Sequence, residues 1–275
     1  MLFAFMSCLN PGDEIIVPEP AYANYMAFAI SAGAKIRTIA TTIEEGFSLP
    51  KVEKFEELIN ERTKAILICN PNNPTGRTAQ PELLREIVRK CTENGVKLVV
   101  DECFNDFLTD AERHTRKDLL ESNPGLSILR AYTKMYAVPG VRFGWCMTAD
   151  AALIEKLYHA GQPWNVSVIA QACAVAAANE PDWATETAKR IAEERRFLSD
   201  GLAACGLTVF PGEANFLLFR SNDTGLHEKL AEYGIMIRNC DNYRGLSAGY
   251  YRVAVKTREA SKCLLNAIKL IMENG

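Results

Sequence analysis

Residues 131–145 read AYTKMYAVPGVRFGW, a stretch that places Lys134 on a predicted loop, Arg142 eight residues later, and an apolar strand at its end. A lysine amine condenses with an aldehyde only when it is deprotonated, and a cationic or dry setting favours that form. A nearby guanidinium can bind an anionic group. The pair therefore predicts a site for a ligand that carries an aldehyde and a phosphate, as pyridoxal phosphate does. A solvated surface lysine is the alternative.

Short apolar runs alternate with segments of helical period on both sides of this stretch. The candidate strands are Glu14–Val17, Lys35–Ile39, Ala65–Cys69, Lys97–Val100, Leu126–Leu129 and Phe143–Met147. The candidate helices between them are Tyr22–Ala32, Pro50–Asn60 and Pro81–Asn94. This alternation predicts the α/β class, with a three-layer, mainly parallel sheet that carries helices on its faces.

The pattern changes after residue 150. Helical period runs from Ala151 to about Cys205, with breaks at residues 161–163 and at Pro181. Further strands are expected at 207–210, 214–219, 235–238 and 250–255, with helices at 226–233 and 257–272. We therefore expect a large domain over residues 1–185 and a smaller α+β domain over residues 186–275, divided inside a long helix.

Composition narrows the class of partner. The 275 residues are 48% hydrophobic and 24% charged, and the formal net charge is −3. This balance gives no reason to expect nucleic acid or a membrane surface as a partner, and no run approaches the roughly 20 apolar residues of a spanning helix. The nine cysteines form no CxxC pair, and the three histidines lack metal-ligand spacing. We expect a cytoplasmic protein with a small-molecule partner and no metal.

Polar residues follow two of the predicted strands. The run NPNNPTG, residues 70–76, comes directly after Ala65–Cys69, and Asn73 can present its amide to a ligand oxygen. Asp101 ends the run that begins at Lys97. Open α/β sheets bind ligands at the carboxyl ends of their strands, so both residues are candidates for a binding site. A tight turn and a helix cap or solvated charge are the respective alternatives.

These motifs together resemble the fold-type I pyridoxal phosphate enzymes, in the group that contains histidinol-phosphate aminotransferases and threonine-phosphate decarboxylases. The likeness covers essentially the whole sequence, with residues 70–76, 101–102 and 133–144 in the family's order and spacing. The resemblance implies that Lys134 forms the Schiff base with pyridoxal phosphate and acts as the catalytic acid and base. It also implies that Asp101 pairs with the ring nitrogen and that Asn73 binds the ring 3-oxygen and lies beside the substrate.

Three further residues take roles from the resemblance. Tyr22 is similar to the aromatic side chain that stacks on the cofactor ring, Arg142 to a ligand of the cofactor phosphate, and Arg252 to the arginine that binds the substrate α-carboxylate. A lone tyrosine or arginine at these places is otherwise a core or surface residue. The family also implies a homodimer that acts on a small amino acid.

Two segments favour the decarboxylase within this group. Residues 237–246, IRNCDNYRGL, and residues 162–167, QPWNVS, resemble the cobalamin-pathway enzyme that decarboxylates L-threonine O-3-phosphate. Transamination of histidinol phosphate or of another amino acid is the alternative. Arg238 and Arg244 are candidate phosphate contacts, but solvated arginines account for them equally well.

The sequence also departs from the family pattern. Phe104 replaces a tyrosine that often reaches the ring 3-oxygen, and Ala131 replaces a serine or threonine that often binds the phosphate. Residues 1–9 resemble a helix that in the family follows an additional N-terminal portion, which suggests a shortened chain. A non-catalytic remnant is therefore a third alternative.

Overall fold

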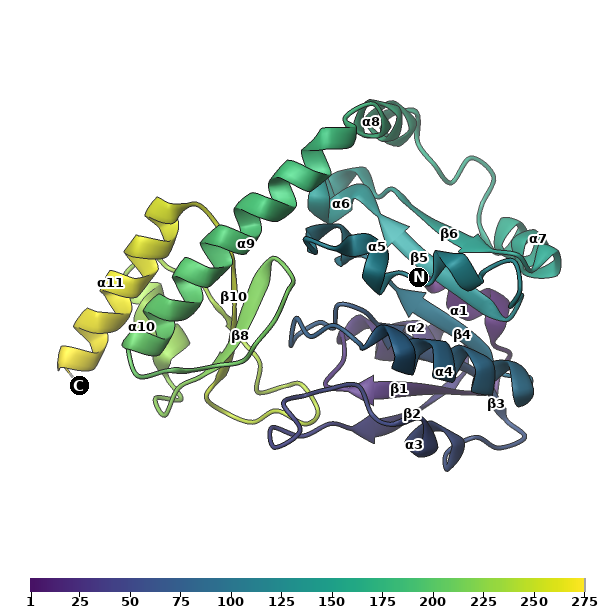
Figure 1. Ribbon diagram of the computed structural model, residues 1–275, viewed down its shortest axis with the longest axis horizontal. Helices are drawn as coiled ribbons and strands as arrows, with labels where there is room; N and C mark the ends of the chain where they lie inside the picture. The colour runs from purple at the N-terminus through teal and green to yellow at the C-terminus, as the bar shows by residue number, and fades with distance from the viewer. Residues whose placement is uncertain (275) are drawn as a thin grey trace.

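Six strands form the larger sheet of the computed structural model, which describes residues 1–274 (Figure 1). The strands are β1 (Glu14–Glu19), β2 (Lys35–Ala40), β3 (Thr63–Cys69), β4 (Lys97–Asp101), β5 (Leu126–Ala131) and β6 (Gly144–Thr148). Their order is β2-β1-β3-β4-β5-β6. All neighbours pair in parallel except β5 and β6, which are antiparallel. The mainly parallel sheet that the sequence predicted is confirmed.

Side chains alternate between two core clusters on the faces of this sheet, because successive residues of a strand point to opposite sides. Ile66 and Ile68 of β3 pack with α3 (Val52–Glu56) and α4 (Pro81–Glu93). Ala65 and Leu67 of the same strand pack with α1 (Leu2–Cys8) and α2 (Asn24–Ser31) on the other face. Helices thus cover both faces, and the expected three-layer α/β fold is confirmed.

Three helices follow β6, namely α7 (Ala151–Ala160), α8 (Val168–Ala178) and the long α9 (Pro181–Ala204). Figure 1 shows α9 running from α8 to a second sheet. That sheet contains β7 (Thr208–Val209), β8 (Phe216–Arg220), β9 (Arg238–Asn239) and β10 (Tyr250–Ala254), in the antiparallel order β7-β8-β10-β9. The helices α10 (Leu226–Glu232) and α11 (Arg258–Asn274) pack on it around a separate core cluster. The domain boundary near residue 185 stays a prediction, and it falls inside α9.

Some elements differ from the expectation. Lys134 lies on a one-turn helix, α6 (Tyr132–Met135), rather than on a loop, because four residues are too few to show a helical period. The strand expected at residues 235–238 overlaps β9 only at Arg238. Short helical turns also fill the connections around the site: η1 (Asn105–Phe107), α5 (Ala111–His114), η2 (Lys117–Leu119) and η3 (Pro139–Val141).

The loop before β8 makes a close backbone contact with the loop that follows β3. Gly76 has a φ of 72°, and a Cβ built there would lie 3.2 Å from the Cα of Gly212. The amide of Glu213 donates a hydrogen bond to the carbonyl oxygen of Gly76 at 2.7 Å. Glycine is therefore needed on both sides of this contact. The contact brings the start of β8 to the carboxyl edge of β3.

Candidate active site

Asn73 and Arg252 meet across the two sheets. Asn73 belongs to the loop after β3 and is buried, with 6% of its surface exposed. Its Oδ1 accepts a hydrogen bond from Nη1 of Arg252, which lies on β10. The two residues are 179 positions apart in the chain, so only the fold brings them together. The structure thus joins the predicted 3-oxygen ligand to the predicted carboxylate ligand.

Two aromatic rings connect Arg252 to Lys134. The Arg252 guanidinium lies 5.0 Å from the centroid of the Phe216 ring, and Phe216 meets Phe104 edge to face at 5.1 Å. The Nζ atom of Lys134 lies 5.9 Å from the centroid of the Phe104 ring, within the range of cation–π attraction. Lys134 itself is exposed, whereas both phenylalanines are buried. The predicted catalytic lysine therefore faces the same apolar cluster as the predicted carboxylate ligand.

Asp101 ends β4, beside the end of β3, and its carboxylate is held by two neutral donors. The hydroxyl of Tyr25 donates to Oδ2 at 2.7 Å, and the backbone amide of Cys103 donates to Oδ1 at 3.1 Å. Cys69 is the residue opposite Asp101 in the parallel ladder. The residue is buried, with 7% of its surface exposed. Because both partners are neutral, the negative charge of Asp101 is left to pair with a cation such as a protonated ring nitrogen.

Tyr22 and Arg142, the other two predicted cofactor ligands, differ in their placement. Tyr22 is 37% exposed, and its ring meets the Tyr25 ring edge to face at 5.5 Å. Because the Tyr25 hydroxyl contacts Asp101, Tyr25 lies between Tyr22 and Asp101. Arg142 is exposed, and its Nη1 donates to the carbonyl oxygen of Pro139 at 2.7 Å. The hydrogen bond of Arg142 thus lies within its own loop. Its role as a phosphate ligand stays a prediction.

The asparagine-rich loop is fixed by its own side chains. Oδ1 of Asn70 accepts from the amide of Ala79 at 2.8 Å, and its Nδ2 donates to the carbonyl oxygen of His114 at 3.2 Å. Oδ1 of Asn72 accepts from both the amide and the hydroxyl of Thr75. The loop therefore presents Asn73 in a fixed place, since its two neighbouring asparagines satisfy buried backbone groups.

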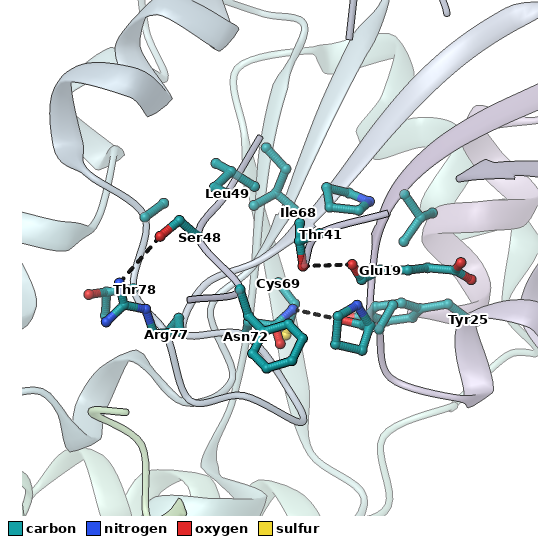
Figure 2. A pocket seen from close by; sticks show the side chains of 16 residues that line it. Glu19, Tyr25, Thr41, Ser48, Leu49, Ile68, Cys69, Asn72, Arg77 and Thr78 are labelled. Carbon is teal, nitrogen blue, oxygen red and sulfur yellow. Dashed lines mark hydrogen bonds between the residues drawn. The ribbon is translucent and has the colours of Figure 1, made fainter. Parts of the chain in front are cut away.

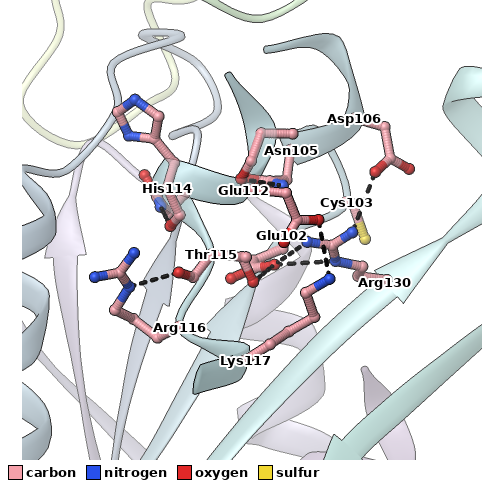
Figure 3. A network of polar contacts seen from close by, with 12 residues as sticks. Glu102, Cys103, Asn105, Asp106, Glu112, His114, Thr115, Arg116, Lys117 and Arg130 are labelled. Carbon is pink, nitrogen blue, oxygen red and sulfur yellow. Dashed lines mark hydrogen bonds and ion pairs between the residues drawn. The ribbon is translucent and has the colours of Figure 1, made fainter. Parts of the chain in front are cut away.

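A buried ion pair supports the strand ends beneath the site (Figure 3). Nη2 of Arg130 lies 2.7 Å from Oε2 of Glu102, and the hydroxyl of Thr115 donates to the same oxygen at 2.9 Å. The Glu102 side chain is fully buried, at 0% exposure. Burial raises the pKa of Glu102 above its ordinary value, although Arg130 acts in the opposite direction. Glu102 directly follows Asp101, and Arg130 stands four residues before Lys134. The ion pair therefore connects the segment that carries Asp101 to the segment that carries Lys134.

Two cavities lie beside the site. One of about 30 Å³ is lined by Tyr25, Cys69 and Asn72 among others, and Figure 2 shows these side chains around it. That volume holds water but no organic cofactor. The second, of about 220 Å³, lies next to Tyr22 and is bordered by Arg244. Lys134 lines neither cavity.

Sequence reasoning missed Tyr25 and Phe216. Tyr25 lies in the first turn of α2 and follows Tyr22 by three residues, a spacing that would place both side chains on one side of the helix expected from Tyr22, although α2 itself begins at Asn24. That spacing is a signal for the pair, but nothing in it identifies the acceptor of the Tyr25 hydroxyl. Phe216 reads as an ordinary core residue of a strand, and only the packing of the second sheet against the first gives it a place in the site.

Comparison with known proteins assigns the family. The family model of aminotransferase class I and II matches residues 1–268. The chain is 32% identical over 274 residues to the threonine-phosphate decarboxylase of Salmonella typhimurium, covering 98% of this chain and 74% of that protein. It is 31% identical over 260 residues to histidinol-phosphate aminotransferase 2 of Archaeoglobus fulgidus, covering 94% of this chain and 71% of that protein.

A solved structure agrees with the sequence relatives. The histidinol-phosphate aminotransferase from Clostridium acetobutylicum superposes with a TM-score of 0.92 at 26% identity, over 100% of this chain and 81% of that one. The two sequence relatives and the solved structure therefore agree with the family model. The chain belongs to the class I and II aminotransferases, and it is an enzyme that depends on pyridoxal phosphate.

Proposed function

We propose that this enzyme decarboxylates a small phosphorylated amino acid, with L-threonine O-3-phosphate as the first candidate. The observation that carries the proposal is the continuous contact from Lys134 through Phe104 and Phe216 to Arg252. It places an amine that can move protons and a guanidinium that can bind a carboxylate on one apolar cluster. The similarity to a threonine-phosphate decarboxylase at 32% identity supports the choice of substrate.

The donor set fits pyridoxal phosphate. Asp101 is a buried carboxylate with neutral partners, which suits a ring nitrogen that carries a proton. The Asn73 amide uses Oδ1 for Arg252, and its Nδ2 is the remaining donor of that side chain for the ring 3-oxygen. Tyr22 presents a half-exposed ring for stacking. When bound, the cofactor supplies an aldehyde for the substrate amine and a ring that draws electrons from the α-carbon.

Each residue of the chain then has a separate task. We infer that Arg252 orients the substrate by gripping its carboxylate with two hydrogen bonds. Lys134, on the short helix α6, delivers or removes a proton at the α-carbon through its Nζ. Phe104 and Phe216 exclude water from the space between the lysine and the arginine. Arg142 is proposed as a ligand of the cofactor phosphate.

Decarboxylation and transamination share these residues and differ in which bond of the α-carbon breaks. In decarboxylation the carboxylate leaves as carbon dioxide and a proton from Lys134 takes its place, so threonine phosphate gives the phosphate ester of an aminopropanol. In transamination the α-proton leaves instead and the amino group passes to a keto acid. The similarity to a histidinol-phosphate aminotransferase at 31% identity keeps transamination as the second candidate.

Incubation of the cofactor-loaded enzyme with each substrate separates these activities. We expect release of carbon dioxide from L-threonine O-3-phosphate without consumption of a keto acid. Transfer of the amino group of histidinol phosphate to 2-oxoglutarate, with no carbon dioxide from threonine phosphate, would replace the first candidate by the second. A Lys134→Ala variant serves as the control, because it keeps the fold and loses the proton donor.

We further propose that the enzyme is a cytoplasmic homodimer with domains 1–185 and 186–275. Exposed apolar side chains on α7 and α8 support an interface there, with Tyr158 82%, Val168 81% and Ile169 70% exposed. Surfaces of this kind commonly mark contacts with another chain. Within residues 1–274, none of the helices has the length and apolar character needed to cross a membrane.

A further inference from the structure

Tyr25 is a buried tyrosine that contacts two of the predicted cofactor ligands. Its side chain is 1% exposed and belongs to the core between α2 and the sheet, with Val17, Leu67 and Val99. Its hydroxyl reaches Oδ2 of Asp101 at 2.7 Å. A phenylalanine would fill the same core position, so the hydroxyl group requires an explanation beyond packing.

The direction of this hydrogen bond is settled by the surroundings. Burial, and next the charge of Asp101, hold the pKa of the Tyr25 phenol well above its ordinary value. The phenol therefore stays protonated and donates, and the carboxylate accepts. With the Cys103 amide on Oδ1, both oxygens of Asp101 are anchored, so the plane of the carboxylate is fixed. Each oxygen keeps a lone pair for another donor.

The ring of Tyr25 has a second task. It supports Tyr22 edge to face, with 5.5 Å between the centroids and 88° between the planes. The amide of Tyr25 also donates to the carbonyl oxygen of Tyr22 at 3.0 Å. One residue thus fixes the side chain beneath the predicted ring nitrogen and the aromatic that is predicted to stack on the ring.

We propose that Tyr25 is a positioning residue of the cofactor site, which acts through its hydroxyl on Asp101. This inference rests on the proposed assignment of Asp101 as the partner of the ring nitrogen. A fixed carboxylate loses less conformational freedom when the cofactor binds, and so binds it more tightly than a mobile one. Tyr25 does not touch the reacting atoms, so its effect is on affinity and on the geometry of the bound ring.

The test compares Tyr25→Phe with Tyr251→Phe. Tyr251 is the matched control, because it is also fully buried and its hydroxyl donates to the carbonyl oxygens of Thr224, at 2.6 Å, and Asp223, at 3.1 Å. Both variants lose one buried hydroxyl and should lose similar thermal stability. Only Tyr25→Phe should raise the dissociation constant for pyridoxal phosphate, by about tenfold, since its lost hydrogen bond reaches a charged group. It should also change the visible circular dichroism of the bound cofactor.

A double-mutant cycle shows whether the hydroxyl acts through Asp101. In an Asp101→Ala background, adding Tyr25→Phe should change the dissociation constant by less than about twofold, because no carboxylate remains to be fixed. Equal effects of Tyr25→Phe in both backgrounds, or wild-type affinity and dichroism in the single variant, would overturn the inference. Failure of the wild-type protein to bind the cofactor would instead reject the proposed function.

Discussion

The pair of Glu102 and Arg130 offers a test of how burial sets the strength of an ion pair. Removing the guanidinium with Arg130→Met leaves a carboxylate whose side chain is 0% exposed, with the Thr115 hydroxyl as its remaining side-chain donor. Arg130 contributes two contacts to Oε2, at 2.7 Å from Nη2 and 3.0 Å from Nε. Water cannot reach the carboxylate to replace them. The variant should therefore carry the full desolvation cost of Glu102.

Loss of one partner from a buried ion pair costs about 3 to 5 kcal/mol. For a chain of this size, that loss corresponds to a fall in the melting temperature of about 6 to 20 °C. The free energy of unfolding at neutral pH, measured by urea denaturation with circular dichroism, checks the value. The matched control is Arg85→Met, because Arg85 lies at the same 2.7 Å from Asp118 but with 52% and 48% of the two side chains exposed.

An exposed pair contributes at most about 1 kcal/mol, so Arg85→Met should be close to the wild type in stability. The double variant Glu102→Gln with Arg130→Met should recover part of the loss, because the fully buried Glu102 charge is removed. Asp106, which also pairs with Arg130 at 3.2 Å, loses its partner in both variants, so recovery is expected to be incomplete. Equal stability losses in Arg130→Met and Arg85→Met would refute the reasoning that burial decides the strength of this pair.

Arg252, Phe216 and Glu102 can each be tested by a single substitution. Arg252→Lys should raise KM for the amino acid and lower kcat/KM roughly tenfold to a hundredfold, because a lysine cannot form two parallel hydrogen bonds with a carboxylate. Unchanged steady-state kinetics would contradict this role of Arg252. Phe216→Leu should raise KM by a few-fold and change kcat less, because the Arg252 guanidinium loses the aromatic ring that lies 5.0 Å from it. Equal changes in KM and kcat would count against a role of Phe216 in positioning Arg252. Burial raises the pKa of Glu102 above its ordinary value of 4.5, so above that pH the folded chain binds more protons than the unfolded chain. The stability of the wild type relative to Glu102→Gln should therefore fall as pH rises above 4.5. A difference in urea denaturation that stays flat or rises as pH increases above 4.5 would exclude the shift.

The central strands of the large sheet were predictable because each contains a run of mostly apolar, buried residues, and the partly buried edge strands β2 and β6 were predictable from the apolar residues that they carry. Runs of four buried residues occur in β1, β3, β4 and β5, and helices separate them along the chain. Such buried strands allow few arrangements other than a parallel sheet. The predicted strands therefore agree with β1 to β6 to within about two residues at each end. The position of Lys134 on α6 was not predictable, because a single helical turn has no period.

Contacts between distant residues set the limit of the sequence analysis. The motifs predict Asn73, Asp101 and Lys134 as site residues, but the hydrogen bond between Tyr25 and Asp101 joins residues 76 positions apart. Local patterns carry no information on such a partner. The bounds predicted for the strand at residues 235–238 were wrong for a similar reason, because β9 is a short edge strand that is positioned by its pairing with β10. Edge strands bury less surface, so their residues follow the alternation less closely.

The assignment of Lys134 as the residue that binds the cofactor is tested most directly by reduction with borohydride. The purified protein is loaded with pyridoxal phosphate, treated with sodium borohydride, digested and mapped by mass spectrometry. We expect the pyridoxyl label on the peptide that contains Lys134, and we expect no label on a Lys134→Ala variant. A label on another lysine, or a loaded protein that takes up no label, would contradict the assignment.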